Sequence, residues 1–140
     1  MLEKYIENKF IKDSQTVVCK IHGFLGIEQL KKGMSDSLEI MIKYHGVHLV
    51  LDVSEMKVLP EDIITWMKDS WYASVSNAEI GHVYFITPRN IFGKMSIQSA
   101  NKAVEFYTPK INVSYHSDII ILLRELSSNL SSSKAINSVA

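Results

Sequence analysis

The hydrophobic period of the sequence changes several times along the chain, and this alternation constrains the fold more than any other feature. Residues 16–22 (TVVCKIH) are β-branched and apolar, as is typical of a strand. From Ile27 to Ile42, apolar residues recur every three or four positions, as on the buried face of an amphipathic helix. The next run, Val47–Val53, is short and nearly continuously apolar, which is typical of a central parallel strand. Strands that alternate with helices predict right-handed crossovers and a mostly parallel sheet.

The same alternation continues to the end of the chain. The weakly alternating segment 5–12 precedes the strand at 16–22 across a polar turn, and together they predict a hairpin. Further helices are predicted from Pro60 to Asn77, Ser96 to Tyr107 and Ile119 to Leu126, and further strands at 82–87 and 110–115. The predicted fold class is α/β, with a mixed, mostly parallel sheet of about five strands, an N-terminal hairpin and four helices.

Length and composition predict one globular domain. The chain has 140 residues, which is the usual size of a single domain, and we assign residues 1–126 to it. Residues 127–140 include six serines and too little apolar surface to offset the entropy of ordering. A flexible, Ser-rich C-terminal tail is therefore predicted there.

Charge and cysteine content exclude several classes of protein. The 15 basic and 15 acidic residues give a net charge of zero, which argues against a general nucleic-acid binder. One cysteine excludes a disulfide framework and a Cys-rich zinc site. Charges interrupt the first ten residues as they would not in a signal peptide, and the longest apolar run, Ile119–Leu123, is far shorter than the ~20 residues that span a bilayer. We expect a cytoplasmic protein without stable membrane insertion.

Three segments resemble a known family. The segment 47–56 (VHLVLDVSEM) resembles the central strand and Asp-containing turn of STAS domains, the anti-sigma-factor-antagonist fold. The segments 59–71 (LPEDIITWMKDSW) and 81–96 (GHVYFITPRNIFGKMS) are similar to STAS-like proteins related to CRAL-TRIO lipid-binding domains. The resemblance covers residues 16–126. It implies a small bacterial-type signalling or ligand-binding module that is usually not an enzyme.

One functional feature of that family is missing here. In partner-switching STAS proteins, a Ser or Thr at the start of the helix after the central strand is phosphorylated. Counted from Asp52, this position falls at Glu61 or Asp62, and neither is a substrate for a Ser/Thr kinase. Acids in a first helical turn also favour the helix dipole, so they need no regulatory explanation.

Polar residues follow three of the predicted strands, where open α/β sheets usually bind ligands. We expect three loops to meet at this edge of the sheet. They hold Asp52, Ser54, Glu55 and Lys57; Thr87, Arg89, Asn90 and Phe92; and His116, Ser117 and Asp118. Arg89 with Lys57 is a candidate anion site.

The sequence contains no established catalytic or metal motif. No Gly-x-Ser-x-Gly elbow surrounds Ser54, Ser96 or Ser117, and no His-x-x-x-His or Glu-x-x-His pair is present. Histidines 22, 82 and 116 lie on separate segments. We therefore predict no catalytic residue, no metal site and no cofactor.

The predicted helix at 60–77 carries an unusually broad apolar arc formed by Trp66, Met67, Trp71 and Tyr72. Two interpretations remain open. The four side chains fill the core and a helix-packing edge, or they form an exposed or pocket-lining patch that contacts a protein or a lipid.

The sequence thus predicts a non-catalytic, STAS-like interaction module that docks a protein partner or forms a homodimer. The alternative is a binding protein for a small apolar ligand such as a fatty acid, and the second alternative is an enzyme of unknown reaction. The predicted ligand or partner surface consists of Trp66, Met67, Trp71, Tyr72, Ser54, Lys57, Arg89, Asn90 and Phe92.

Overall fold

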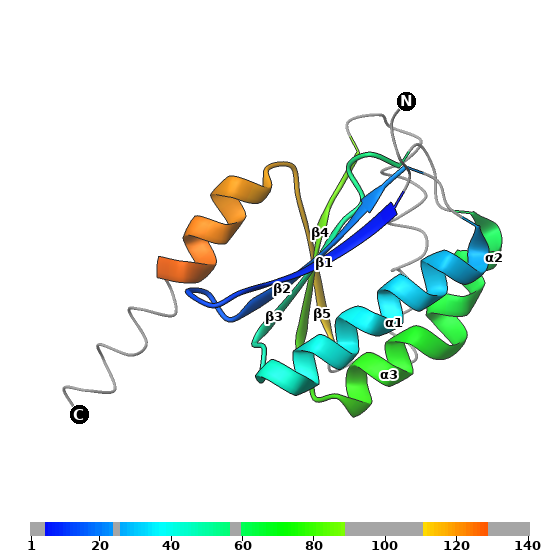
Figure 1. The fold of residues 1–140 in the computed structure, drawn as a ribbon, viewed down its shortest axis with the longest axis horizontal. Helices are drawn as coiled ribbons and strands as arrows, with labels where there is room; N and C mark the ends of the chain where they lie inside the picture. Colours follow the sequence, from blue (N-terminus) through cyan, green and yellow to red (C-terminus); the bar gives the residue numbers. More distant parts are fainter. Residues whose placement is uncertain (1–4, 24–25, 57–59, 89–110, 129–140) are drawn as a thin grey trace.

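The structure is a computed structural model that describes residues 5–23, 26–56, 60–88 and 111–128. Within these residues, five strands form one sheet, and three helical segments pack on it (Figure 1). The strands are β1 (Tyr5–Ile11), β2 (Thr16–His22), β3 (His48–Asp52), β4 (His82–Ile86) and β5 (Asn112–His116). The helical segments are α1 (Ile27–Tyr44), the continuous run α2 (Glu61–Trp66), η1 (Met67–Trp71) and α3 (Tyr72–Asn77), and the helix at residues 119–128.

The strand order confirms the predicted fold class. The strands lie in the sheet in the order of the sequence, with β1 antiparallel to β2 and the remaining pairs parallel. The predicted hairpin is therefore present at one edge. Of the four predicted helices, the one at 96–107 lies outside the described residues, as do residues 129–140 of the predicted tail.

The topology makes the two faces of the sheet different. Right-handed crossovers between successive neighbouring strands place their connecting helices on the same face. Accordingly, α1 and the run from α2 to α3 lie on one face, and the helix at 119–128 lies on the other (Figure 1). We call these the first and the second face of the sheet.

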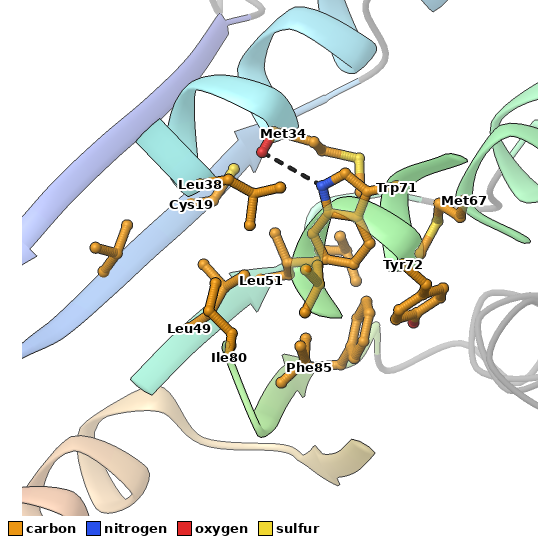
Figure 2. Packing of buried hydrophobic residues seen from close by; sticks show 14 of the residues in the cluster. Cys19, Met34, Leu38, Leu49, Leu51, Met67, Trp71, Tyr72, Ile80 and Phe85 are labelled. Atoms are coloured by element: carbon orange, nitrogen blue, oxygen red, sulfur yellow. Dashed lines mark hydrogen bonds between the residues drawn. The ribbon is translucent and has the colours of Figure 1, made fainter. Parts of the chain in front are cut away.

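The main core lies between the first face and its helices. Leu49 and Leu51 of β3 pack there, while Val50 between them points to the second face. Trp71 lies at the centre of this core, where its indole Nε1 donates a hydrogen bond to the carbonyl oxygen of Met34 in α1 at 3.4 Å (Figure 2). This contact ties η1 to α1.

A π-helical turn allows the helix at 61–77 to bury side chains that are spaced four residues apart. Ile63, Met67, Trp71 and Val75 are all buried. On an α-helix, positions four apart drift by about 40° per step, because 3.6 residues complete a turn. In η1 the amide of Tyr72 donates to the carbonyl of Met67, five residues back, and this wider turn offsets the drift. The π turn therefore keeps the apolar positions facing the sheet.

A smaller core holds the helix at 119–128 on the second face. Leu122 and Leu126 are its buried residues, and they pack against four strand residues. Those residues are Val18, Val50, Tyr84 and Ile86. The helix thus depends on few contacts for its position.

Gly33 is a point of close approach between α1 and β1. A Cβ atom at this position would lie 2.8 Å from Cγ2 and 3.1 Å from Cβ of Ile6. The Gly33 carbonyl also accepts a hydrogen bond from Nδ2 of Asn8 at 3.1 Å. The absence of a side chain at position 33 therefore sets the distance between helix and strand.

We predict that Gly33→Ala lowers the free energy of unfolding, although alanine is the better helix former by about 1 kcal/mol. Overpacking of this kind costs about 1–3 kcal/mol, which outweighs the helical gain. Urea denaturation of the variant measures the difference. In an Ile6→Ala background the same substitution should become stabilising, because the obstructing side chain is gone. An unchanged sign in that background would contradict the packing argument.

Candidate functional site

A polar pocket of about 570 Å³ lies where the parallel strands end on the second face. It contains residues from each of the three loops expected to meet at this edge. Its lining residues are Lys20, Asp52, Ser54, Ile86, Thr87, Ser117, Asp118, Ile119 and Ile120. The volume lies within the range of small-molecule sites, roughly 300–1,000 Å³.

Backbone hydrogen bonds beyond the strand ends bring these loops together. The amide of Val53 donates to the carbonyl of Ile86 at 3.0 Å, and the amide of Thr87 donates to the carbonyl of His116 at 3.0 Å. The sheet pairing therefore continues into the loops. These main-chain bonds hold the starts of the three loops together beside the pocket.

Asp52 is the most deeply buried acid of the pocket, with 2% of its surface exposed. Its Oδ1 accepts hydrogen bonds from the amide of Ser54 at 3.1 Å and from Oγ of Ser54 at 2.6 Å. A buried carboxylate requires such partners because it has lost its hydration. The two bonds fix the direction of the loop as it leaves β3.

Asp118 begins the helix at 119–128. Its Oδ1 accepts hydrogen bonds from the amides of Ile120 at 2.9 Å and Ile121 at 3.2 Å, which are unpaired donors of the first helical turn. The negative charge also suits the positive end of the helix dipole. The capping role of Asp118 thus couples the rim of the pocket to the helix.

The sequence did not indicate Lys20 as a pocket residue. Lys20 of β2 is the register partner of Asp52 in β3, and both lie on the second face. The alternation of side chains along a strand could have indicated its face, because Lys20 is two residues from Val18 and therefore lies on the same face of the sheet. The missing information was the order of the strands.

The topology also brings together three histidines that lie far apart in the sequence. His82 stacks on Tyr84 with ring centroids 3.9 Å apart, and its Nε2 lies 2.9 Å from Oγ of Ser114. Nε2 of His116 lies 2.9 Å from the same oxygen. The hydroxyl of Tyr84 lies 3.3 Å from Nδ1 of His48. We call His48, His82, Tyr84, Ser114 and His116 the histidine cluster.

Burial lowers the pKa values of two histidines of this cluster, His48 and His82. Partial burial lowers the pKa of His82, and the charges of His48 and His116 lower it further. Burial also lowers the pKa of His48 and raises the pKa of Tyr84. The imidazoles of His48 and His82 therefore present nitrogen lone pairs and N–H donors without charge at neutral pH.

The remaining residues of the predicted surface fall into two groups. Met67, Trp71 and Tyr72 are buried in the main core, and Trp66 is only partly buried against it. Among these four, the helix presents only Trp66 towards solvent. The other group, Lys57, Arg89, Asn90 and Phe92, lies outside the described residues.

Two further properties of the described part of the chain concern metal-binding groups and membrane-spanning helices. Within residues 5–23, 26–56, 60–88 and 111–128, no three or more His, Cys, Asp and Glu side chains are grouped so that they could hold a metal ion. In the same ranges, no helix combines the length and the apolar character needed to cross a membrane.

Comparison with solved structures identifies the fold. The chain is similar to the crystal structure of an uncharacterised protein of the DUF3478 family from Shewanella loihica PV-4, which has a SpoIIAA-like fold. The TM-score is 0.54 at 17% sequence identity, and the match covers 90% of this chain and 97% of the other. No protein-family model and no curated protein matches the sequence.

The chain therefore has a STAS-like, SpoIIAA-like fold, which confirms the family resemblance at the level of fold. At this identity the likeness extends to the architecture alone. Function has to be argued from the surfaces and pockets that this chain builds on it.

Proposed function

We propose that this chain is a non-catalytic STAS-type interaction module that docks a protein partner through the helix at 119–128. The observation that carries the proposal is the exposure of two adjacent large apolar side chains on that helix, Ile120 at 61% and Ile121 at 55%. Exposed apolar side chains that cluster on one element are typical of interaction sites.

The surroundings of these isoleucines support a protein as the occupant. Leu122 and Leu126 anchor the opposite side of the helix in the second core. Arg124 and Glu125, both exposed, follow the isoleucines along the outward side. An apolar centre with charged residues beside it is the usual anatomy of a protein interface. The polar pocket next to Ile120 adds hydrogen-bonding groups to the same surface.

Site-specific photo-crosslinking in cells that produce the protein tests this proposal. A benzoylphenylalanine at position 121 is expected to crosslink to a partner, whereas one at the exposed position 73 on α3 is not. The captured protein is then purified and its affinity measured. We expect Ile121→Glu to weaken binding at least tenfold, since central apolar contacts contribute about 1.4 kcal/mol or more. Light scattering of the purified chain shows whether the partner is a second copy.

Equal crosslinking from positions 121 and 73, or undiminished binding by Ile121→Glu, would contradict the proposal. Circular dichroism of the variant provides the control for folding. Because position 121 is exposed, the substitution leaves the second core intact.

One observation favours a small apolar ligand as the second candidate. A pocket of about 230 Å³ between the helix at 119–128 and the hairpin is lined by apolar side chains, two lysines and one glutamate. The apolar residues are Ile11, Val18, Ile119 and Leu123, and the polar ones are Glu7, Lys9 and Lys20. This lining suits a short acyl chain with a carboxylate. Native mass spectrometry of the purified protein would detect such a ligand.

A further inference from the structure

The second face of the sheet carries three histidines on three neighbouring strands, His48 on β3, His82 on β4 and His116 on β5. All three are partly exposed. His48 and His82 share the face because each lies an even number of residues along its own strand from a residue of the second core, Val50 and Ile86 respectively. His116 lies on the same face because it is the register partner of Ile86. No part of the proposed docking helix is needed to form this cluster, so it requires its own explanation.

The centre of the cluster is the hydroxyl of Ser114. Nε2 atoms of two imidazoles, from His82 and His116, lie 2.9 Å from Oγ of Ser114. A hydroxyl has one proton to donate and two lone pairs that accept. When an imidazole is neutral and its Nε2 carries a lone pair, the hydroxyl donates its proton to that nitrogen. The hydroxyl of Ser114 then has no proton left to donate to a ligand.

Protonation reverses this arrangement. When both rings are imidazolium ions, both Nε2 atoms carry hydrogen, and Oγ of Ser114 accepts from both. Its own proton must then point away from the two rings. The same step places two positive charges beside that freed donor. Proton uptake therefore creates a group of donors and charges that suits an anion.

We propose that His82, Ser114 and His116 form an acid-gated binding site for a small tetrahedral oxyanion, such as free sulfate or phosphate. The rings are already positioned: His82 stacks on Tyr84 with an interplanar angle of 8°, and His116 lies 5.7 Å from the same ring. His48, on the other side of Tyr84, adds a third titratable cation to the face.

Neither of the two strands that form the site, β4 and β5, presents a competing carboxylate on the second face. On the second face, β4 presents His82, Tyr84 and Ile86, and β5 presents Asn112, Ser114 and His116. Two acids lie on the neighbouring elements. Asp52 is two strands away from His116 in the same register row, and Asp118 caps the helix at 119–128. That helix also carries Arg124 and Glu125, both exposed.

The direction of the pH dependence follows from linkage. The pKa of His82 is lowered in the folded protein by burial and by the neighbouring histidines, so protonation of His82 is less favourable in the folded than in the unfolded protein. A bound anion removes the repulsion and raises that pKa, and proton uptake and anion binding therefore strengthen each other. Without an anion, the lowered pKa means that stability is lost as the pH falls below the unfolded value of about 6.5.

Sulfate is the appropriate probe because its own charge does not change over the range tested. Calorimetry and histidine-ring NMR at about pH 5.5 and about pH 7.5 should show binding at least tenfold tighter in acid. Chloride at equal ionic strength controls for screening. Ser114→Ala should weaken acid-state binding several-fold, and the double variant His82→Gln/His116→Gln should abolish it. His45→Asn, an exposed histidine outside the cluster, should bind as the wild type does.

Equal sulfate affinity at the two pH values would overturn the proposal, as would undiminished binding by the double variant. Circular dichroism and thermal unfolding establish that each variant is folded before binding is measured. Partner docking through Ile121 is measured separately at neutral pH, so failure of the oxyanion site and failure of the proposed function are distinguishable.

Discussion

Replacing Trp71 by alanine is expected to lower the free energy of unfolding by about 3–5 kcal/mol. Only 1% of this side chain is exposed, and it fills the space between α1 and the first face of the sheet (Figure 2). The substitution removes that apolar surface, leaves a cavity and breaks the hydrogen bond to Met34. Because domains of this kind are stable by only about 5–15 kcal/mol, the loss is a large fraction of the total.

Urea denaturation followed by circular dichroism measures this effect. Trp66→Ala is the matched control, since it removes the same side chain from the same helix at a partly exposed position, and about 1–2 kcal/mol is expected. Trp71→Phe gives a folded alternative that keeps an aromatic ring but loses the indole donor. Equal losses for the two alanine variants would contradict the assignment of Trp71 to the core.

Replacing Leu122 by alanine is expected to cost about 2–5 kcal/mol and to release the helix at 119–128 first. Leu122 is 2% exposed and is one of two buried residues that hold this helix on the second face. Hydrogen exchange should show faster exchange of amides 119–128 while those of β3 stay protected. This pattern follows because the strands retain the larger core on the first face.

The neighbouring residue provides the control for this prediction. Ile121→Ala removes the same number of carbon atoms from an exposed side chain, so its effect should lie within about 0.5 kcal/mol of zero. The affinity for the partner should show the opposite ranking, because Ile121→Ala removes a side chain that contacts the partner directly. Comparable destabilisation by both substitutions would mean that the helix is held differently from the arrangement in Figure 1.

For the helix at 61–77, the hydrophobic pattern predicts the helix but not which of its apolar side chains are buried. The broad arc of Trp66, Met67, Trp71 and Tyr72 was visible in the sequence, with core packing and surface exposure both left open. The structure buries three of the four side chains. The π turn explains the breadth of the arc, since it changes which positions face the sheet. The periodicity of a regular α-helix does not predict where a π turn occurs.

The polar pocket shows a different limit. The loops after β3, β4 and β5 were expected to meet because the carboxyl ends of parallel strands lie at one edge of a sheet. Asp52, Ser54, Thr87, Ser117 and Asp118 do lie around one pocket. Lys20 was missed, because its place beside Asp52 depends on β2 being the immediate neighbour of β3.

The sequence by itself determined the fold class, the hairpin, the two described crossover helices and the edge at which polar loops gather. Each of these follows from local periodicity and from the handedness of chain connections, which are properties of short segments. Only the tertiary structure decided that His48, His82 and His116 share one face, and that Ile121 is exposed while Leu122 is buried. Those outcomes depend on strand order and on which face each helix covers. They are set by contacts between residues far apart in the chain, which local sequence patterns do not encode.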